Sequence, residues 1–169
     1  REKLNWMNQQ YLLKLPEEEY FRMIDDVIQK GDYHNQDSGK IRQAAEILKT
    51  RLVTLSDLNQ KLGLFFEENP EIKDLQAIEV LKEDNSKTVL KEFLQQAENL
   101  DQLTSENLGQ LVKSVQKTTG IKGRGLWMPL RCAITREVSG PELPAMLDFF
   151  GGEKCLHLIR QTLENPSLN

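Results

Sequence analysis

Six basic residues lie in a stretch of the chain that contains no acidic residue, residues 107–136. This stretch carries a charge of +6, although the whole chain has a net charge of −4 and the remainder therefore −10. Cations gathered against an acidic background are typical of a surface that binds a polyanion such as nucleic acid. Chance clustering on a solvated face explains the same charges equally well. The six cations are Lys113, Lys117, Lys122, Arg124, Arg131 and Arg136.

Residues 124–136 are predicted to form a helix with an apolar side and a basic side. The apolar side holds Leu126, Leu130, Ala133 and Ile134. Arg124, Arg131 and Thr135 fall near the opposite side, so we expect two guanidinium groups and a hydroxyl to face solvent together. The guanidinium fork donates paired hydrogen bonds to phosphates and to base edges. If Pro129 instead marks the first helical turn, Lys122 and Arg124 lie in a glycine-flanked loop that is still basic.

The remaining residue types form no pattern that performs catalysis or holds a metal. Cys132 and Cys155 form no C-x-x-C pair, and His34 and His157 are far apart in the sequence, so no metal-ligand spacing is present. The sequence also contains no glycine-rich phosphate loop and no G-x-S-x-G nucleophile motif. We therefore expect no active site and no cofactor in this chain, and we expect both cysteines to be small buried hydrophobic residues.

The composition is that of an ordinary globular protein, with 169 residues, 38% of them apolar and 28% charged. No window approaches about 18 consecutive apolar residues, and the first six residues lack the build of a signal peptide. We expect neither a membrane span nor secretion. The two unpaired cysteines suit a reducing compartment, so the expected location is the cytoplasm or an organelle matrix.

Apolar residues recur at helical spacing along nearly the whole chain, which predicts an all-α fold. One predicted helix starts near Thr54 and stops at Gly63. Helical periodicity ends where an apolar run meets acids and a proline, near Asn69. We place the boundary between two small helical subdomains there, residues 1–68 and residues 69–169.

Three aromatic residues could stack on bases or pack inside the protein. Trp6 and Tyr11 are five positions apart, and such aromatics are predicted to pack in the core. Trp127 lies between the apolar and basic sides of its helix. Stacking on a base would be worth about 1–3 kcal/mol, although partial burial is the simpler interpretation.

Four stretches of the chain are similar to motifs of one protein family. Residues 3–12 match K-L-x-W-x-N-x-x-Y followed by an apolar residue, and residues 51–58 match R-x-x-T-L-x-[ED]-L before a Phe-Phe pair. Residues 123–135 resemble G-[KR]-x-L-[FW]-x-P-L-R-x-A-L-T, with Ile134 in place of the last leucine, and residues 140–143 match G-P-x-L. In this order, spanning nearly the whole chain, they resemble the C-terminal anticodon-binding region of bacterial-type glutamyl-tRNA synthetases.

The resemblance implies two helical subdomains of a class I glutamate–tRNA ligase, with glutamate tRNA as the partner. It also implies a catalytic domain N-terminal to this chain, which would use ATP and magnesium. The H-I-G-H-like and K-M-S-K-S-like motifs of that domain do not occur here. We therefore expect no activation of glutamate by this chain alone, and we expect a monomer.

The resemblance also assigns residues. Arg51 matches the arginine that faces the first anticodon base, a cytosine or a modified uridine, in members that discriminate against glutamine tRNA, and Lys49 is the nearby alternative. Arg131 and Thr135 match the P-L-R-x-A-L-T helix, which lies against the anticodon loop. The family commonly has glycine after this helix, where this chain has Arg136. The predicted tRNA-binding residues are Arg51, Lys49, Lys122, Arg124, Arg131, Thr135 and Arg136.

Two other functions fit the sequence. A helical protein-interaction module would take a partner helix in an apolar groove, and its basic strip would be incidental. A catalytic fragment of another class would need a nucleophile or an acid–base pair, and the sequence offers neither.

Overall fold

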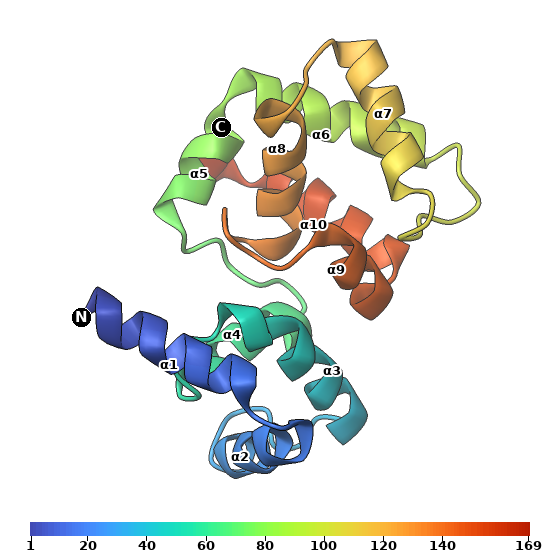
Figure 1. Cartoon of the computed structure of the whole chain (residues 1–169). Coiled ribbons are helices and arrows are strands. Elements are labelled where there is room, and N and C mark those ends of the chain that lie inside the picture. Colours follow the sequence, from blue (N-terminus) through green and yellow to red (C-terminus); the bar gives the residue numbers. More distant parts are fainter. The chain divides into compact units, whose positions relative to one another are not determined.

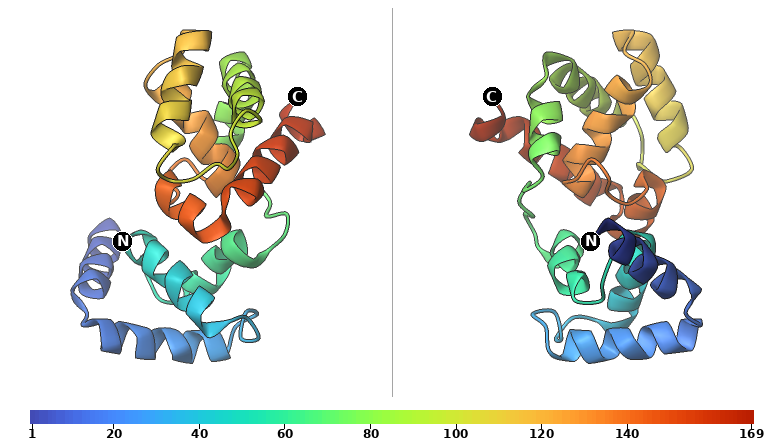
Figure 2. Two further views of the ribbon diagram at one scale, coloured as in Figure 1. Left: turned by 90° about the vertical axis from the view of Figure 1, so that its right-hand side faces the viewer. Right: turned by 60° about the vertical axis from the view of Figure 1, so that its left-hand side comes forward.

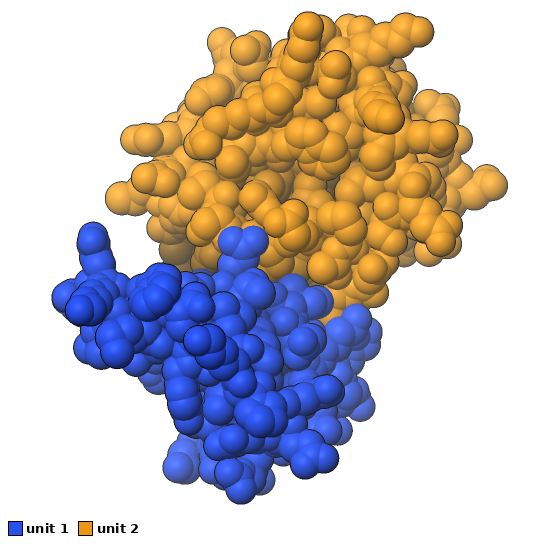
Figure 3. Space-filling view, viewed as in Figure 1, with its two compact units in different colours: residues 1–68 blue, residues 69–169 orange.

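The computed structural model describes residues 1–169 and contains helices and no strand (Figure 1). The predicted all-α fold is confirmed. The chain forms two compact units, Arg1–Glu68 and Asn69–Asn169 (Figure 3). The first unit holds α1 (Glu2–Lys14), α2 (Glu17–Gln29), α3 (Ser38–Leu48), the 3-10 helix η1 (Lys49–Arg51) and α4 (Asp57–Phe66). The second holds α5 (Leu75–Lys82), α6 (Asp84–Ala97), α7 (Leu108–Thr119), α8 (Arg124–Thr135), α9 (Leu143–Phe150), α10 (Gly152–Glu164) and the 3-10 helix η2 (Pro166–Leu168).

The core of the first unit lies between α2, α3 and α4. Tyr20 is fully buried, and its hydroxyl donates to the carbonyl of Ala45 at 2.8 Å, which ties α2 to α3. The predicted end of a helix at Gly63 is wrong, because α4 continues to Phe66. Gly63 is instead a site of close approach. A Cβ there would lie 2.8 Å from the Glu67 carboxylate and 3.1 Å from the hydroxyl of Tyr33, which are hydrogen bonded to each other.

Helix α1 exposes most of its apolar side chains. Trp6 is 62% exposed and Tyr11 56% exposed, so the prediction that both pack in the core is wrong. The helix instead turns Leu12 inward, and Gln9 donates to the carbonyl of Thr50 in η1 at 2.7 Å. Because α1 contacts its unit mainly along η1, only a narrow side of this helix is buried.

Helix α8 is the centre of the second unit and packs against α5, α6, α9 and α10 (Figures 1 and 2). Its predicted apolar side is confirmed, since all four residues of that side are buried. Pro129 lies inside the helix, so the alternative in which it marks the first turn is wrong. The missing N–H of Pro129 would have bonded the carbonyl of Gly125, which belongs to an exposed residue that water reaches.

Both cysteines of the second unit are buried hydrophobic residues, as predicted. Burial raises the pKa of each thiol to about 12, so both remain protonated at neutral pH. None of the helices combines the length and the apolar character that crossing a bilayer requires.

Candidate nucleic-acid interface

The turn between α7 and α8 presents two cations. It depends on two glycines in the left-handed half of backbone space, Gly120 at φ 73° and Gly123 at φ 58°. Lys122 lies between them, Arg124 is the first residue of α8, and both are exposed. Cations at a helix N-terminus oppose the macrodipole, which favours anions there. An RNA phosphate bound here would neutralise the cations and accept hydrogen bonds from backbone N–H groups at the start of α8.

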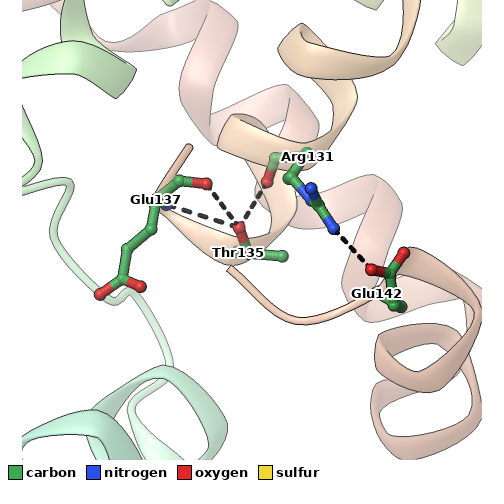
Figure 4. A network of polar contacts seen from close by, with 4 residues as sticks. All are labelled: Arg131, Thr135, Glu137 and Glu142. Atoms are coloured by element: carbon green, nitrogen blue, oxygen red, sulfur yellow. Dashed lines mark hydrogen bonds and ion pairs between the residues drawn. The ribbon is translucent and has the colours of Figure 1, made fainter. Parts of the chain in front are cut away.

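Arg131 lines a pocket beside α8, and its guanidinium is paired with an acid. Its Nη2 is 3.1 Å from Oε1 of Glu142, with the arginine side chain 24% exposed and the glutamate side chain 72% exposed (Figure 4). Glu142 immediately precedes α9, at the N-cap position. The pocket holds about 600 Å³ and is lined by Arg124, Trp127, Met128, Arg131, Glu142, Leu143 and Pro144.

The pocket combines an aromatic wall with hydrogen-bond donors. Trp127 is 43% exposed, so the partial burial expected from the sequence is confirmed, and the residue lines the pocket. Its neighbours Arg124 and Arg131 carry the donors, and Met128 adds apolar surface. This volume lies within the range of small-molecule sites, about 300–1,000 Å³. The arrangement can stack a base and donate hydrogen bonds to its edge.

Thr135 does not face solvent, and the prediction that its hydroxyl does is wrong. It is 1% exposed, and its Oγ1 donates to the carbonyl of Arg131 at 2.8 Å and lies 2.9 Å from that of Glu137 (Figure 4). A Cβ at Gly140 would overlap the Thr135 side chain. The threonine therefore joins the end of α8 to the glycine of the G-P-x-L motif, and it acts on the pocket through packing.

Arg136 is also buried, which contradicts its assignment to the binding surface. It is 5% exposed, and its Nη1 donates to the carbonyl of Ala133 at 2.8 Å and to Oγ1 of Thr162 at 2.7 Å. Its Nη2 donates to Oε1 of Gln161 at 2.7 Å. The guanidinium thus lies at the C-terminal ends of α8 and α10, where both helix dipoles favour a cation. Burial lowers the pKa of Arg136 to about 10, which leaves it charged at neutral pH.

Arg136 also has an unusual backbone conformation. Its φ is 64°, and no other non-glycine residue has a positive φ. Glycine adopts this left-handed conformation without penalty, which explains why glycine suits the position after this helix. In this chain the side chain has hydrogen bonds through Nη1 and Nη2, whereas its buried Nε has no partner.

The two predicted binding residues of the first unit both lie in η1. Arg51 is half-buried, and the neighbouring Leu52 is fully buried and anchors its backbone. The Nζ of Lys49 lies 4.7 Å from the centre of the Tyr20 ring, a cation–π contact that holds this side chain against α2.

The structure therefore brings Arg124 and Arg131 together in one pocket, and it buries Thr135 and Arg136. Lys122 does not line this pocket and lies two residues before Arg124. Sequence reasoning did not select Glu142 as a site residue. The sequence did offer one indication of it. Glu142 lies within the G-P-x-L motif, which follows the basic helix after a short connection.

Comparison with known proteins identifies related sequences. The sequence profile of the family described as "Anticodon binding domain" matches residues 9–163. A glutamate–tRNA ligase of Latilactobacillus sakei is 33% identical over 168 residues, which cover 96% of this chain and 34% of the relative. A glutamate–tRNA ligase of Lactiplantibacillus plantarum is 36% identical over 156 residues, with 89% and 31% covered. The chain thus spans about a third of the length of these relatives.

The fold is also similar to that of solved structures. A crystal structure of a glutamate tRNA ligase from Elizabethkingia meningosepticum matches with a TM-score of 0.69 and 23% sequence identity. The match covers 95% of this chain and 32% of that one. At this identity the likeness supports the fold alone.

Proposed function

Because the chain belongs to the anticodon-binding domain family, we propose that it reads the anticodon loop of glutamate tRNA for a longer glutamate–tRNA ligase. The observation that carries the proposal is the pocket beside α8, where a half-exposed Trp127 lies with two arginines in the most basic part of the chain. Indole and guanidinium groups together suit an unstacked base better than they suit an apolar peptide helix.

In the proposed complex the pocket takes one base of the loop. The base stacks on Trp127, and Arg131 donates to an acceptor on its edge. Lys122 and Arg124 hold phosphates at the N-terminus of α8, which sets the register of the loop. Thr135 supports this arrangement from inside, because its hydroxyl bonds the backbone of Arg131.

We assign the first anticodon base to Arg51 in the first unit. Its backbone is held by the buried neighbours Leu48 and Leu52, and η1 is tied to α1 by Gln9. A guanidinium on a fixed backbone can read a base edge through two parallel hydrogen bonds.

The chemistry of aminoacylation belongs, in this proposal, to a catalytic domain outside this chain. The resemblance assigns ATP and magnesium to that domain, whose nucleotide motifs do not occur in this sequence. We propose that this chain alone is inactive. We also propose that it is a monomer attached to that domain, in the cytoplasm or an organelle matrix.

The proposal is tested by fluorescence-monitored binding to anticodon stem-loops that carry C or U at the first anticodon position, against a scrambled loop, at two salt concentrations. We expect salt-sensitive binding that prefers the anticodon loops. Arg51→Ala should flatten the preference at the first base, which a bidentate contact makes worth about 1–3 kcal/mol. Lys82→Ala, at an exposed lysine of α5, is the control. Equal or absent binding to all three loops would contradict the function.

Lys122→Ala is expected to weaken every loop by a similar factor, about two- to fivefold at low salt. Because its contact is to phosphate, the slope of log affinity against log salt should fall in magnitude by roughly 0.7. A change in base preference without a change in slope would show that Lys122 contacts a base instead.

One observation favours the alternative of a protein-interaction module, namely the exposed apolar side chains of α1. This alternative predicts no salt-dependent RNA binding, so the same titrations separate the two functions.

A further inference from the structure

The acid in the pocket is unexpected in a nucleic-acid interface. Glu142 lines the pocket together with Arg131, and its Oε1 is 3.1 Å from Nη2 of Arg131. The two charges cancel at short range. Of the three charged residues that line the pocket, Arg124 alone remains to give it a net positive charge.

The Arg131–Glu142 pair disfavours binding of a phosphate and favours binding of a base edge. A phosphate that approaches Arg131 must displace Glu142 and then remains within a few ångströms of a like charge. A base presents a donor and an acceptor side by side on its pairing edge, and carries no charge. Its ring N–H or amino group can donate to the carboxylate while Arg131 donates to its carbonyl or ring nitrogen.

We propose that Glu142 is a specificity-determining residue that makes the pocket accept a base edge and reject a phosphate. The inference rests on the proposed function, because it assumes that the pocket faces RNA. Without the carboxylate, Arg131 would bind any phosphate of the backbone, and the loop could bind out of register. With it, phosphates are directed to the turn before α8, where Lys122 is exposed and the stretch 107–136 contains no acidic residue.

The experiment compares a nucleoside with its phosphate ester. In a Trp6→Phe background Trp127 is the one tryptophan left, and its fluorescence reports the pocket. Trp6 is 62% exposed, so its replacement leaves the fold intact. We titrate the protein with cytidine and with cytidine 5′-monophosphate in EDTA. In the parent protein we expect the affinities for cytidine and for the monophosphate to differ by no more than about threefold. In Glu142→Gln we expect the ratio of the monophosphate affinity to the cytidine affinity to rise by roughly tenfold.

Glu153→Gln is the matched control, because Glu153 is an exposed acid in the first turn of α10 and the variant has the same net charge. It should leave the ratio unchanged. Glutamine keeps the size of Glu142 and can still accept a hydrogen bond, and the partly exposed ion pair adds little stability, so Glu142→Gln should remain folded.

Three results would overturn the inference. The first is an affinity ratio of monophosphate to cytidine that is the same in Glu142→Gln as in the parent. The others are a strong preference of the parent for the monophosphate, and no binding of either compound to either protein. The stem-loop titrations separate this failure from that of the proposed function. Selective loop binding with an unchanged ratio overturns the role of Glu142 alone. A shifted ratio without loop selectivity overturns anticodon reading alone.

Discussion

Arg131→Ala is expected to reduce the affinity for the cognate anticodon stem-loop by about 100-fold, or roughly 2.7 kcal/mol. The variant loses the guanidinium that donates to the base, and the carboxylate of Glu142 then faces the RNA without the positive charge of Arg131 beside it. The like charges of the carboxylate and the RNA backbone then repel each other across the pocket. The measurement is a fluorescence titration at constant salt.

The double variant Arg131→Ala with Glu142→Gln separates the two causes. It should recover about tenfold of the lost affinity, because the repulsion disappears while the missing donor is not replaced. Arg131→Lys should be intermediate, since ammonium keeps the charge and loses the planar fork. Equal affinities for the single and the double variant would show that Glu142 does not act on the ligand. Thermal unfolding should change little, because the ion pair is partly exposed.

Arg136→Ala is expected to lower the free energy of unfolding of the second unit by about 3 kcal/mol. The change removes charged hydrogen bonds from Arg136 to the last turns of α8 and α10 and leaves the carbonyl of Ala133 and the amide of Gln161 without this donor. Urea unfolding followed by Trp127 fluorescence in the Trp6→Phe background measures the effect. Trp127 lies in the second unit, so the signal reports that unit.

Arg136→Gly separates the loss of the hydrogen bonds from the strain of the backbone. It loses the same hydrogen bonds, but glycine adopts a φ of 64° without strain, so it should be less destabilising than alanine by about 1 kcal/mol. If alanine and glycine were both as stable as the parent, Arg136 would not join the two helices. RNA affinity at temperatures where all variants are folded should not change, because the residue is buried.

Helix periodicity was enough to predict the all-α fold and the buried side of α8. Leu126, Leu130 and Ile134 recur every three to four residues, and a single helix projects such residues to one side whatever it packs against. The same reasoning failed for Trp6 and Tyr11, because apolar character predicts burial only if a neighbouring element covers the side chain. In this chain α1 has η1 for a neighbour and little else.

The residues that carry the candidate site were harder to predict, because charge in the sequence does not show exposure in the fold. Lys122, Arg124, Arg131 and Arg136 are equivalent in a count of cations, yet two are exposed, one is paired with an acid and one is buried. Each outcome depends on residues distant in sequence, such as Gln161 and Thr162 for Arg136.

The sequence by itself therefore determined the helical class, the basic stretch and the resemblance to an anticodon-binding region, because these depend on local periodicity, local charge and the order of motifs. Only the tertiary structure decided which of these cations face solvent and that Glu142 lies against Arg131. The reason is physical: burial and ion pairing are relations between helices, and the packing of α8 against α9 and α10 sets them.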